Sequence, residues 1–391
     1  MKLYWHNRSI KYTQDEIDIA VLAMQEALPL TQGKYLELFE NRFQEYLPAK
    51  HAFAVSTGSS ALDLSAMLLN IEHGDEVLIP AHTWCATAIS FARQGAKVVW
   101  MDINPETFVV DLDSIKNTIS PKTKAIVIVH LYGLMCPMEE IVKFCKQRNI
   151  IIIEDCAQSL GASIDGRHCG SFGDISMFSF HANKNISTLG EGGMITVNSD
   201  EYAYEISLLK HNGVSAFENK GEMYWKPAMS NILYNNSGLW PYNYSIGEVQ
   251  CAVGYKLIDR IDELNTERNR RAKKVKDELS DCKELVFQKV PEGYFHAYHC
   301  LVAYYDAKEK GERDQFMLHL WKNYEIQAIV QNCPLYRYPL FIENGLSEAN
   351  CPNTDQFFDN MVSFPFYVWM EEEHLEYMIN SIKKTSEYFR K

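Results

Sequence analysis

The sequence predicts an α/β protein: a large domain with a mostly parallel β-sheet flanked by helices, and a smaller C-terminal α/β domain. Between residues 50 and 200, short apolar runs rich in β-branched residues alternate with longer segments of helical period, as in βαβ units. From about residue 250 a long charged amphipathic segment replaces this alternation. The length of 391 residues accommodates two domains. We therefore expect a large domain over 1–250 and a small domain over 251–391.

The large domain is expected to contain five clear strands, a further strand-like run at Ala52–Val55, and three helices. Each helix begins at a residue that suits a helix start: serine after Gly58, a threonine able to cap, and a proline. The strands are Ala52–Val55, Glu76–Ile79, Lys97–Asp102, Ala125–His130, Ile150–Glu154 and Met194–Val197, and the helices are Ser59–Leu69, Thr83–Gln94 and Pro137–Arg148.

The C-terminal domain is expected to begin with one long amphipathic helix, Ala252–Leu279. A strand at Tyr298–Tyr305 and helices around Asp314–Tyr324 and Glu371–Arg390 follow it. Between the two domains, Asn212–Tyr244 is rich in Asn, Gly, Ser and aromatic residues and is long for a loop. Loops of this length are often functional.

Composition favours a small-molecule enzyme of the cytoplasm. The formal net charge of -13 and the lack of a basic stripe argue against a nucleic-acid partner. Ten cysteines without a C-x-x-C pair favour reduced thiols over a zinc site or a disulfide framework. No signal-like segment and no run of the roughly 20 apolar residues that span a bilayer is present, so neither export nor a membrane partner is expected.

Asp155 is the first candidate for chemistry. It ends the run Ile150–Glu154, which is too apolar for an edge strand, so its carboxylate is expected at the C-terminal rim of the sheet, where ligands bind. There it could hold a protonated pyridine nitrogen. At about 4 Å and an effective dielectric near 20, the attraction is roughly 4 kcal/mol. The alternative is an aspartate that caps a helix or turn.

The segment Ser56–Leu62 is a small-residue loop between a strand and a helix, and it contains Thr57, Gly58 and Ser59. Free backbone N–H groups at such a helix start suit a phosphate. A well-capped helix with nothing bound is the alternative.

Lys184 lies in a segment of aromatic and small residues, without a neighbouring charge, just before a glycine-rich turn. Such surroundings can desolvate the amine and lower its pKa, as a nucleophile requires. Ser179, five residues earlier, could offer its hydroxyl to the same phosphate. The alternative for Lys184 is a solvated surface charge.

The order of these motifs resembles the DegT–StrS sugar aminotransferases, which share fold type I with aspartate aminotransferase and use pyridoxal 5'-phosphate (PLP). The resemblance covers nearly the whole chain and implies a seven-stranded, mostly parallel sheet in the large domain. The motifs that carry it are Leu30–Gly33, Phe39-Glu40, Thr57–Leu62, Glu154–Gly161, Ser176–Gly193, Tyr242–Gln250 and Ser363–Pro365.

The resemblance also implies roles for individual residues. Lys184 would hold PLP as a Schiff base and move a proton during catalysis, and Asp155 would pair with the pyridine nitrogen. Trp84 would stack on the ring, with a core tryptophan as the alternative, and Gln158 would lie beside the ring. Thr57, Gly58, Ser59 and Ser179 would surround the phosphate. Asn243 would reach the phosphate of the partner subunit, so a homodimer with shared active sites is implied.

The expected reaction is transfer of an amino group from L-glutamate to the carbonyl of a sugar used in bacterial surface polysaccharide or lipopolysaccharide. Some relatives with histidine in place of the lysine are dehydratases. Lys184 favours transamination here, and His181 is expected either to be a packing residue or to contact the residues that touch the cofactor. Ser245 stands where the family often has arginine, and Gln331-Asn332 where it has His-Tyr. A nucleotide-linked keto sugar is therefore weighed against a free oxidised octulosonate, aminated to 8-amino-Kdo. A PLP-binding regulator without turnover is a further alternative.

Overall fold

A computed structural model describes residues 2–5, 8–214, 232–236 and 238–390. Its centre is a seven-stranded sheet in the order β1-β9-β8-β5-β4-β2-β3. All neighbouring strands run parallel except β9, which is antiparallel to both β8 and β1. The strands are β1 (His51–Val55), β2 (Glu76–Pro80), β3 (Lys97–Met101), β4 (Thr123–Val129), β5 (Ile151–Asp155), β8 (Ile175–Ser179) and β9 (Gly193–Val197). The predicted mostly parallel sheet is confirmed.

The strand β5 lies at the centre of this sheet, between β4 and β8. Ile152 and Ile153 are buried because helices cover the sheet, which explains why the run over 150–153 consists entirely of isoleucine. The strand β8 was not among the predicted strands. It has only five residues and follows a turn-rich segment, so its hydrophobic pattern is too short to be recognised in the sequence.

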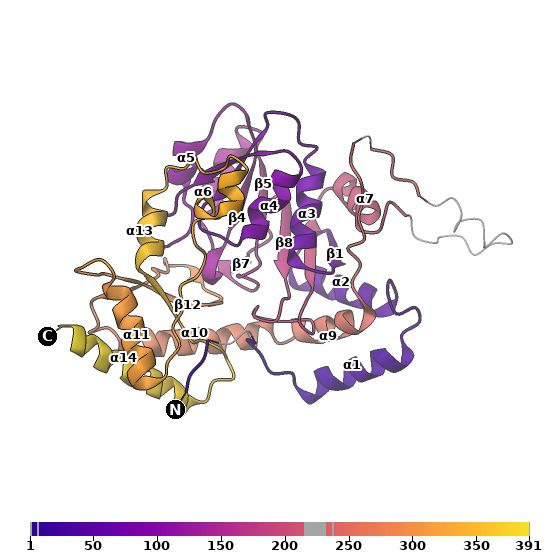
Figure 1. Cartoon of the computed structure of the whole chain (residues 1–391). Helices are drawn as coiled ribbons and strands as arrows, with labels where there is room; N and C mark the ends of the chain where they lie inside the picture. The colour runs from indigo at the N-terminus through magenta and orange to yellow at the C-terminus, as the bar shows by residue number, and fades with distance from the viewer. Residues whose placement is uncertain (1, 6–7, 215–231, 237, 391) are drawn as a thin grey trace.

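Helices of the large domain surround the sheet, except the first, Gln14–Glu26, which lies apart from it (Figure 1). The start of α4 differs from the prediction: Thr83 does not cap it, and Trp84 is the N-cap residue without a side-chain cap bond. Thr83 Oγ1 instead lies 3.3 Å from Thr87 Oγ1. The helices of the large domain are α1 (Gln14–Glu26), α2 (Lys34–Tyr46), α3 (Gly58–Leu68), α4 (Cys85–Arg93), α5 (Leu112–Thr118), α6 (Met138–Lys146) and α7 (Asp200–Leu209). A 3-10 turn, η1, lies at Leu131–Gly133.

The predicted single helix Ala252–Leu279 is wrong, because the structure divides it into α9 (Glu248–Ile258) and α10 (Ile261–Glu278). The break at Asp259 and Arg260 has i→i+3 backbone bonds, and the Arg260 side chain pairs with Glu16 of α1 at 2.6 Å. The apolar side of α9 packs on α1 and α2, while α10 continues along the base of the molecule toward the C-terminal elements (Figure 1). The helix α9 packs in the main hydrophobic cluster, whereas α10 joins that cluster through Ile261 and Leu264 and the C-terminal cluster through Ala272 and Val275.

A second hydrophobic cluster forms at the C-terminal elements, around the three-stranded sheet β10-β12-β13. Leu3 joins this cluster, so the beginning of the chain packs against its end. The predicted strand at Tyr298 starts later, at Leu301, because Tyr298 has a positive φ of 41°. The elements are β10 (Leu285–Phe287), β12 (Leu301–Tyr305), α11 (Glu312–Tyr324), η2 (Leu335–Arg337), α12 (Pro339–Glu343), α13 (Pro352–Asn360), β13 (Met361–Phe364) and α14 (Glu372–Arg390). A domain boundary at residue 250 stays a prediction.

A small third sheet, β11-β6-β7, pairs β11 (Tyr294–Phe295) with β6 (Ser163–Ile164), and β6 with β7 (Arg167–His168). It therefore links a segment of the C-terminal half to the loop that follows β5. Much of the loop predicted at Asn212–Tyr244 (215–231 and 237) lies outside the described residues. Among the described helices, none has the length and apolar character needed to cross a membrane.

Candidate active site

Asp155 ends β5 at the C-terminal rim of the sheet, as its position in the sequence predicts. The side chain is buried, and Oδ2 accepts a 2.9 Å hydrogen bond from Thr87 Oγ1 of α4. Oδ1 accepts a 3.1 Å bond from the backbone N–H of Ala157. Burial raises the pKa of Asp155, and these two hydrogen bonds and the positive charge of Lys184 oppose the shift. The two hydrogen bonds thus fix the orientation of the carboxylate, and its negative charge is only partly balanced by nearby groups.

Lys184 lies in the loop between β8 and β9, and this loop is held from three distant parts of the chain. Ser9 Oγ donates to the carbonyl of Lys184. The next residue, Asn185, donates through Nδ2 to Asn265 Oδ1 at 2.9 Å and to the carbonyl of Ala297 at 2.8 Å. These long-range contacts fix the backbone beside Lys184 and do not involve the Lys184 side chain.

The Lys184 amine and the Asp155 carboxylate belong to one site. Burial lowers the pKa of Lys184, and the negative charge of Asp155 raises it in turn, with a smaller contribution from Cys300. The two charges therefore lie within electrostatic range of each other in a region of low dielectric. The shift favours the neutral amine, which is the nucleophilic form.

The loop between β1 and α3 meets the end of β8. Thr57 is the N-cap of α3 and accepts a 3.0 Å bond from the N–H of Ser60. A Cβ at Gly58 would lie 2.8 Å from the Cβ of Ser179, so only glycine permits this close approach. Ser59, in the first turn of α3, is exposed. Thr57, Gly58, Ser59 and Ser179 thus surround the N-terminus of one helix, which suits a phosphate.

The other three predicted site residues, Trp84, Gln158 and Asn243, lie on three separate segments of the chain. Trp84 is 63% exposed at the start of α4, the helix whose Thr87 holds Asp155, so its indole is free to stack on a ligand. Gln158 follows β5, and its Oε1 accepts a 2.7 Å bond from the N–H of Tyr132. Asn243 is exposed and binds the N–H of Ser245, and within the described residues no hydrogen bond joins it to the phosphate loop.

Comparison with known proteins gives the family. The model of the DegT/DnrJ/EryC1/StrS aminotransferase family matches residues 11–383. The chain belongs to this family. It is therefore a PLP-dependent aminotransferase, and the predicted family, cofactor and enzyme class are confirmed.

Two sequence relatives and one solved structure show the breadth of the likeness. The chain is 31% identical over 373 residues to a GDP-perosamine synthase of Vibrio cholerae, covering 95% of each chain. It is 30% identical to a pleiotropic regulatory protein of Geobacillus stearothermophilus, covering 92% of this chain and 90% of the relative. The X-ray structure of an aminotransferase from Psychrobacter cryohalolentis superposes with a TM-score of 0.87 at 25% identity, covering 98% and 99% of the two chains.

The site of this aminotransferase fits PLP on three structural grounds. Gly58 lets the N-terminus of α3 approach Ser179 closely, which brings backbone N–H groups and hydroxyl groups together as a phosphate requires. Asp155 offers a buried carboxylate that lacks a full counter-charge, as a pyridinium nitrogen requires. Lys184 offers a desolvated amine within electrostatic range of Asp155.

Sequence reasoning missed two supports of the site. Thr87 lies three residues after Trp84, the spacing that places both on one face of α4, but no pattern in the sequence predicts that its hydroxyl binds Asp155. Glu154 is fully buried and accepts hydrogen bonds from His130 Nε2 and from the N–H groups of Gly170, Phe172 and Gly173. With both oxygens engaged in this way, the grouping of His130, Glu154 and Cys156 is a structural support rather than a metal site.

The residues at which this sequence departs from the family pattern also have defined surroundings. Ser245 Oγ lies 3.1 Å from Nδ1 of His211. Burial raises the pKa of the Cys300 thiol to about 11, and the positive charge of Lys184 and a hydrogen bond with Gln331 oppose this shift, so the Gln331 segment borders the lysine site. His181, the predicted packing residue, is only partly buried, and its ring bonds Asn183 at 2.8 Å and faces Glu191 at 3.7 Å.

Proposed function

We propose that the protein transfers an amino group from L-glutamate to the carbonyl of a nucleotide-linked keto sugar for bacterial surface polysaccharide. The likeness to GDP-perosamine synthase over 95% of both chains supports a sugar acceptor. The observation that carries the proposal is the juxtaposition of Lys184, Asp155 and the Thr57–Ser59 phosphate cradle in one site. We place the reaction in the cytoplasm, where nucleotide-linked precursors and reduced thiols are found.

Each residue of the site has a distinct task in this proposal. Bound PLP would accept the donor's amino group and withdraw electrons from the reacting carbon. Thr57, Gly58, Ser59 and Ser179 would hold its phosphate through hydroxyl and backbone N–H donors. Asp155 would keep the ring nitrogen protonated, Trp84 would cover the ring face, and Gln158 would line its edge. The Lys184 Nζ atom would remove a proton from the donor carbon and return it at the neighbouring position.

A homodimer with shared active sites is part of the proposal. The exposed face of α1 and the segment after it carry large apolar side chains, which on a lone subunit would face water. Trp240 is 80% exposed close in sequence to Asn243. The exposed apolar residues are Ile17, Val21, Leu22, Met24, Leu28, Leu30, Trp240 and Tyr242. In this proposal the dimer buries this face, and Asn243 of the partner subunit reaches the phosphate.

A nitrogen-transfer assay tests the proposed function. The holoenzyme is incubated with ¹⁵N-labelled L-glutamate and a panel of acceptors: GDP-linked, UDP-linked and dTDP-linked keto sugars and a free oxidised octulosonate. Gain of the labelled amine by one nucleotide-linked acceptor, detected by mass spectrometry and absent with Lys184→Ala, is the expected result. No transfer to any sugar would contradict the proposal, and loss of water without gain of nitrogen would indicate a dehydratase.

A free octulosonate is the second candidate acceptor. It is favoured by Ser245, which contacts His211 where the family often has arginine, since loss of that guanidinium weakens the case for an anionic nucleotide. Amination of the octulosonate in the same panel, with no reaction of the nucleotide-linked sugars, would replace the first candidate.

A regulatory role without turnover is the third candidate, and the relative named as a pleiotropic regulatory protein favours it. It predicts PLP binding without nitrogen transfer from any donor. The intact lysine site described above supports turnover instead.

A further inference from the structure

A fully buried tyrosine with a left-handed backbone lies in the turn η1, directly after β4. Tyr132 has a φ of 62° and a ψ of 0°, and its side chain is 0% exposed. Bulky side chains rarely adopt this conformation, because it costs free energy that the surrounding contacts must outweigh. Residues held in such conformations cluster at functional sites. The contacts of Tyr132 therefore indicate what the conformation is for.

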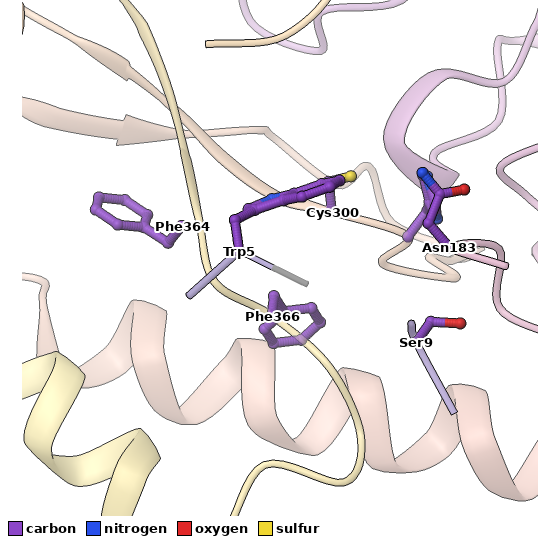
Figure 2. A pocket seen from close by; sticks show the side chains of 7 residues that line it. Trp5, Ser9, Asn183, Cys300, Phe364 and Phe366 are labelled. Atoms are coloured by element: carbon purple, nitrogen blue, oxygen red, sulfur yellow. The ribbon is translucent and has the colours of Figure 1, made fainter. Parts of the chain in front are cut away.

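The turn η1 is docked on the segment that follows β11. The carbonyl of Gly133 accepts a 2.9 Å bond from the N–H of Ala297, and a Cβ on Gly133 would lie 2.7 Å from the backbone nitrogen of Tyr298. Cys300 of the same segment lines the small pocket beside the Lys184 loop (Figure 2). Its N–H donates to the carbonyl preceding Gly133 at 3.5 Å. Tertiary contacts thus hold the turn in its strained conformation.

The backbone and the side chain of Tyr132 bind two different loops. Its N–H donates a 2.7 Å bond to Oε1 of Gln158, in the loop after β5. Its hydroxyl lies 2.7 Å from Nε2 of His82, in the loop after β2. Because β4 lies between β5 and β2 in the sheet, this one residue joins the loops on both sides of its own strand.

These two loops carry the residues that we propose at the ring of the cofactor. Gln158 lies at its edge in that proposal, and no described residue accepts a hydrogen bond from its Nε2, so the bond to Tyr132 leaves the amide one free donor. His82 comes two residues before Trp84, the N-cap residue of α4. A contact that fixes His82 therefore fixes the start of the helix that presents the indole.

The hydroxyl of Tyr132 and the ring of His82 are both uncharged at neutral pH. Burial raises the pKa of Tyr132 well above its ordinary value, and the side chain of Asn332 opposes the shift. Burial lowers the pKa of His82 to about 3, and the backbone of Asn332 opposes that shift. Asn332, which belongs to a departure from the family pattern, thus lies against the same pair.

We infer that Tyr132 is a positioning residue for the ring of the cofactor. Its backbone N–H sets the orientation of the Gln158 amide, and its hydroxyl, through His82, sets the place of Trp84. The inference rests on the proposed roles of Gln158 and Trp84 at the ring. The alternative is a buried tyrosine that only stabilises the large domain.

Titration of the apoenzyme with PLP tests the inference without turnover. Tyr132→Phe removes the hydroxyl and keeps the ring and the backbone. The dissociation constant of PLP should rise roughly two- to tenfold, as loss of a neutral hydrogen bond predicts. The visible circular dichroism of the bound cofactor, which depends on how its ring is held, should also change. Unchanged affinity and unchanged dichroism in Tyr132→Phe would overturn the inference.

Tyr305→Phe is the matched control for loss of a buried tyrosine hydroxyl. Tyr305 is 1% exposed, lies in the C-terminal cluster, and donates to Glu312 Oε1 at 3.4 Å. This variant should lower the unfolding temperature and keep the PLP affinity and the dichroism of the wild type. Equal changes of both quantities in Tyr305→Phe and Tyr132→Phe would overturn the inference in favour of general stabilisation.

A double-mutant cycle tests whether the hydroxyl acts through Trp84. Tyr132→Phe should weaken PLP binding in the wild-type background and have almost no effect in the Trp84→Leu background, because coupled residues are not additive. Equal weakening in both backgrounds would overturn the inference. His82→Leu should weaken binding as Tyr132→Phe does, and His82→Gln, whose amide can still bond the hydroxyl, should restore part of the affinity. Equal binding by the two His82 variants would overturn the link through His82.

Trp84→Leu and Gln158→Leu separate failure of the inference from failure of the proposal on which it rests. Normal PLP binding by both variants would contradict their proposed roles at the ring. Weak binding by both, together with wild-type behaviour of Tyr132→Phe, would overturn only the positioning role of Tyr132.

Discussion

Thr87 Oγ1 donates a 2.9 Å hydrogen bond to Asp155 Oδ2, so the first turn of α4 fixes the carboxylate at the end of β5. Replacing Thr87 by valine keeps the shape and removes the donor. A hydrogen bond to a charged group contributes about 1.5–3 kcal/mol, so turnover should fall roughly ten- to a hundredfold. Steady-state kinetics measure the change. Thr83→Val, which removes a neighbouring buried hydroxyl that does not bind Asp155, is the control and should retain near-normal turnover.

Lys184→Ala should abolish transamination and the visible absorbance band of lysine-bound cofactor. Lys184→Arg should do the same, because arginine keeps the charge but stays protonated and cannot act as the nucleophile. Absorbance spectra and the nitrogen-transfer assay check both variants. Normal turnover by Lys184→Ala would contradict the assignment of this lysine.

The capture of PLP by the apoenzyme should depend on pH through Lys184. Because burial lowers its pKa below the usual value of about 10.4, the rate should rise with pH and level off below that value. Asp155 raises the pKa of Lys184, so in Asp155→Asn the plateau should begin at lower pH. Stopped-flow absorbance measures both profiles. A rate that continues to rise up to the pKa of free lysine would show that the amine is solvated.

Gly58→Ala should weaken cofactor binding, because the added Cβ would lie 2.8 Å from the Cβ of Ser179. Relieving this contact moves the phosphate loop away from the end of β8. Overpacking of this kind costs roughly 1–3 kcal/mol, which corresponds to a fivefold to hundredfold rise in the dissociation constant of PLP. Titration of the apoenzyme with PLP measures it, and unchanged affinity would show that the loop does not hold the phosphate.

Glu154→Gln should destabilise the protein. Burial raises the pKa of Glu154, but the hydrogen bonds from His130 and backbone N–H groups outweigh it, and the net pKa is lowered. Because the pKa of Glu154 is lower in the folded protein, its ionised carboxylate stabilises the fold at pH values above the unfolded pKa of about 4.3. This contribution is lost as the pH falls through the folded pKa. At pH 7 the variant should lose at least about 2 kcal/mol of unfolding free energy in denaturant titrations. The difference from wild type should shrink below pH 4, and a constant difference would contradict the ionised state.

Much of the large domain could be predicted from the sequence because its strands are apolar, separate and linked by helices. The isoleucine run before Asp155 predicts both the central strand and the rim position of the carboxylate. The division between α9 and α10 could not be predicted, since Asp259 and Arg260 are compatible with a continuous helix and only the packing of α9 on α1 and α2 breaks it. Tertiary contact outweighs local propensity there.

The candidate site was predictable where a residue type in a motif limits the chemistry, as with Lys184, Asp155 and Gly58. Thr87 was not predictable, because its importance depends on which side chain the fold brings beside it. A buried threonine on a helix is ordinary in sequence.

The loop that carries Lys184 is secured by Ser9, Asn265 and Ala297, which come from both ends of the chain. A nascent polypeptide that ends after β9 contains Ser9 but lacks Asn265 and Ala297, so two of the three contacts that order this loop are missing. The protein should therefore become able to bind PLP only late in its synthesis, after residues up to Ala297 have left the ribosome. The unfinished chain should not bind PLP from the cell.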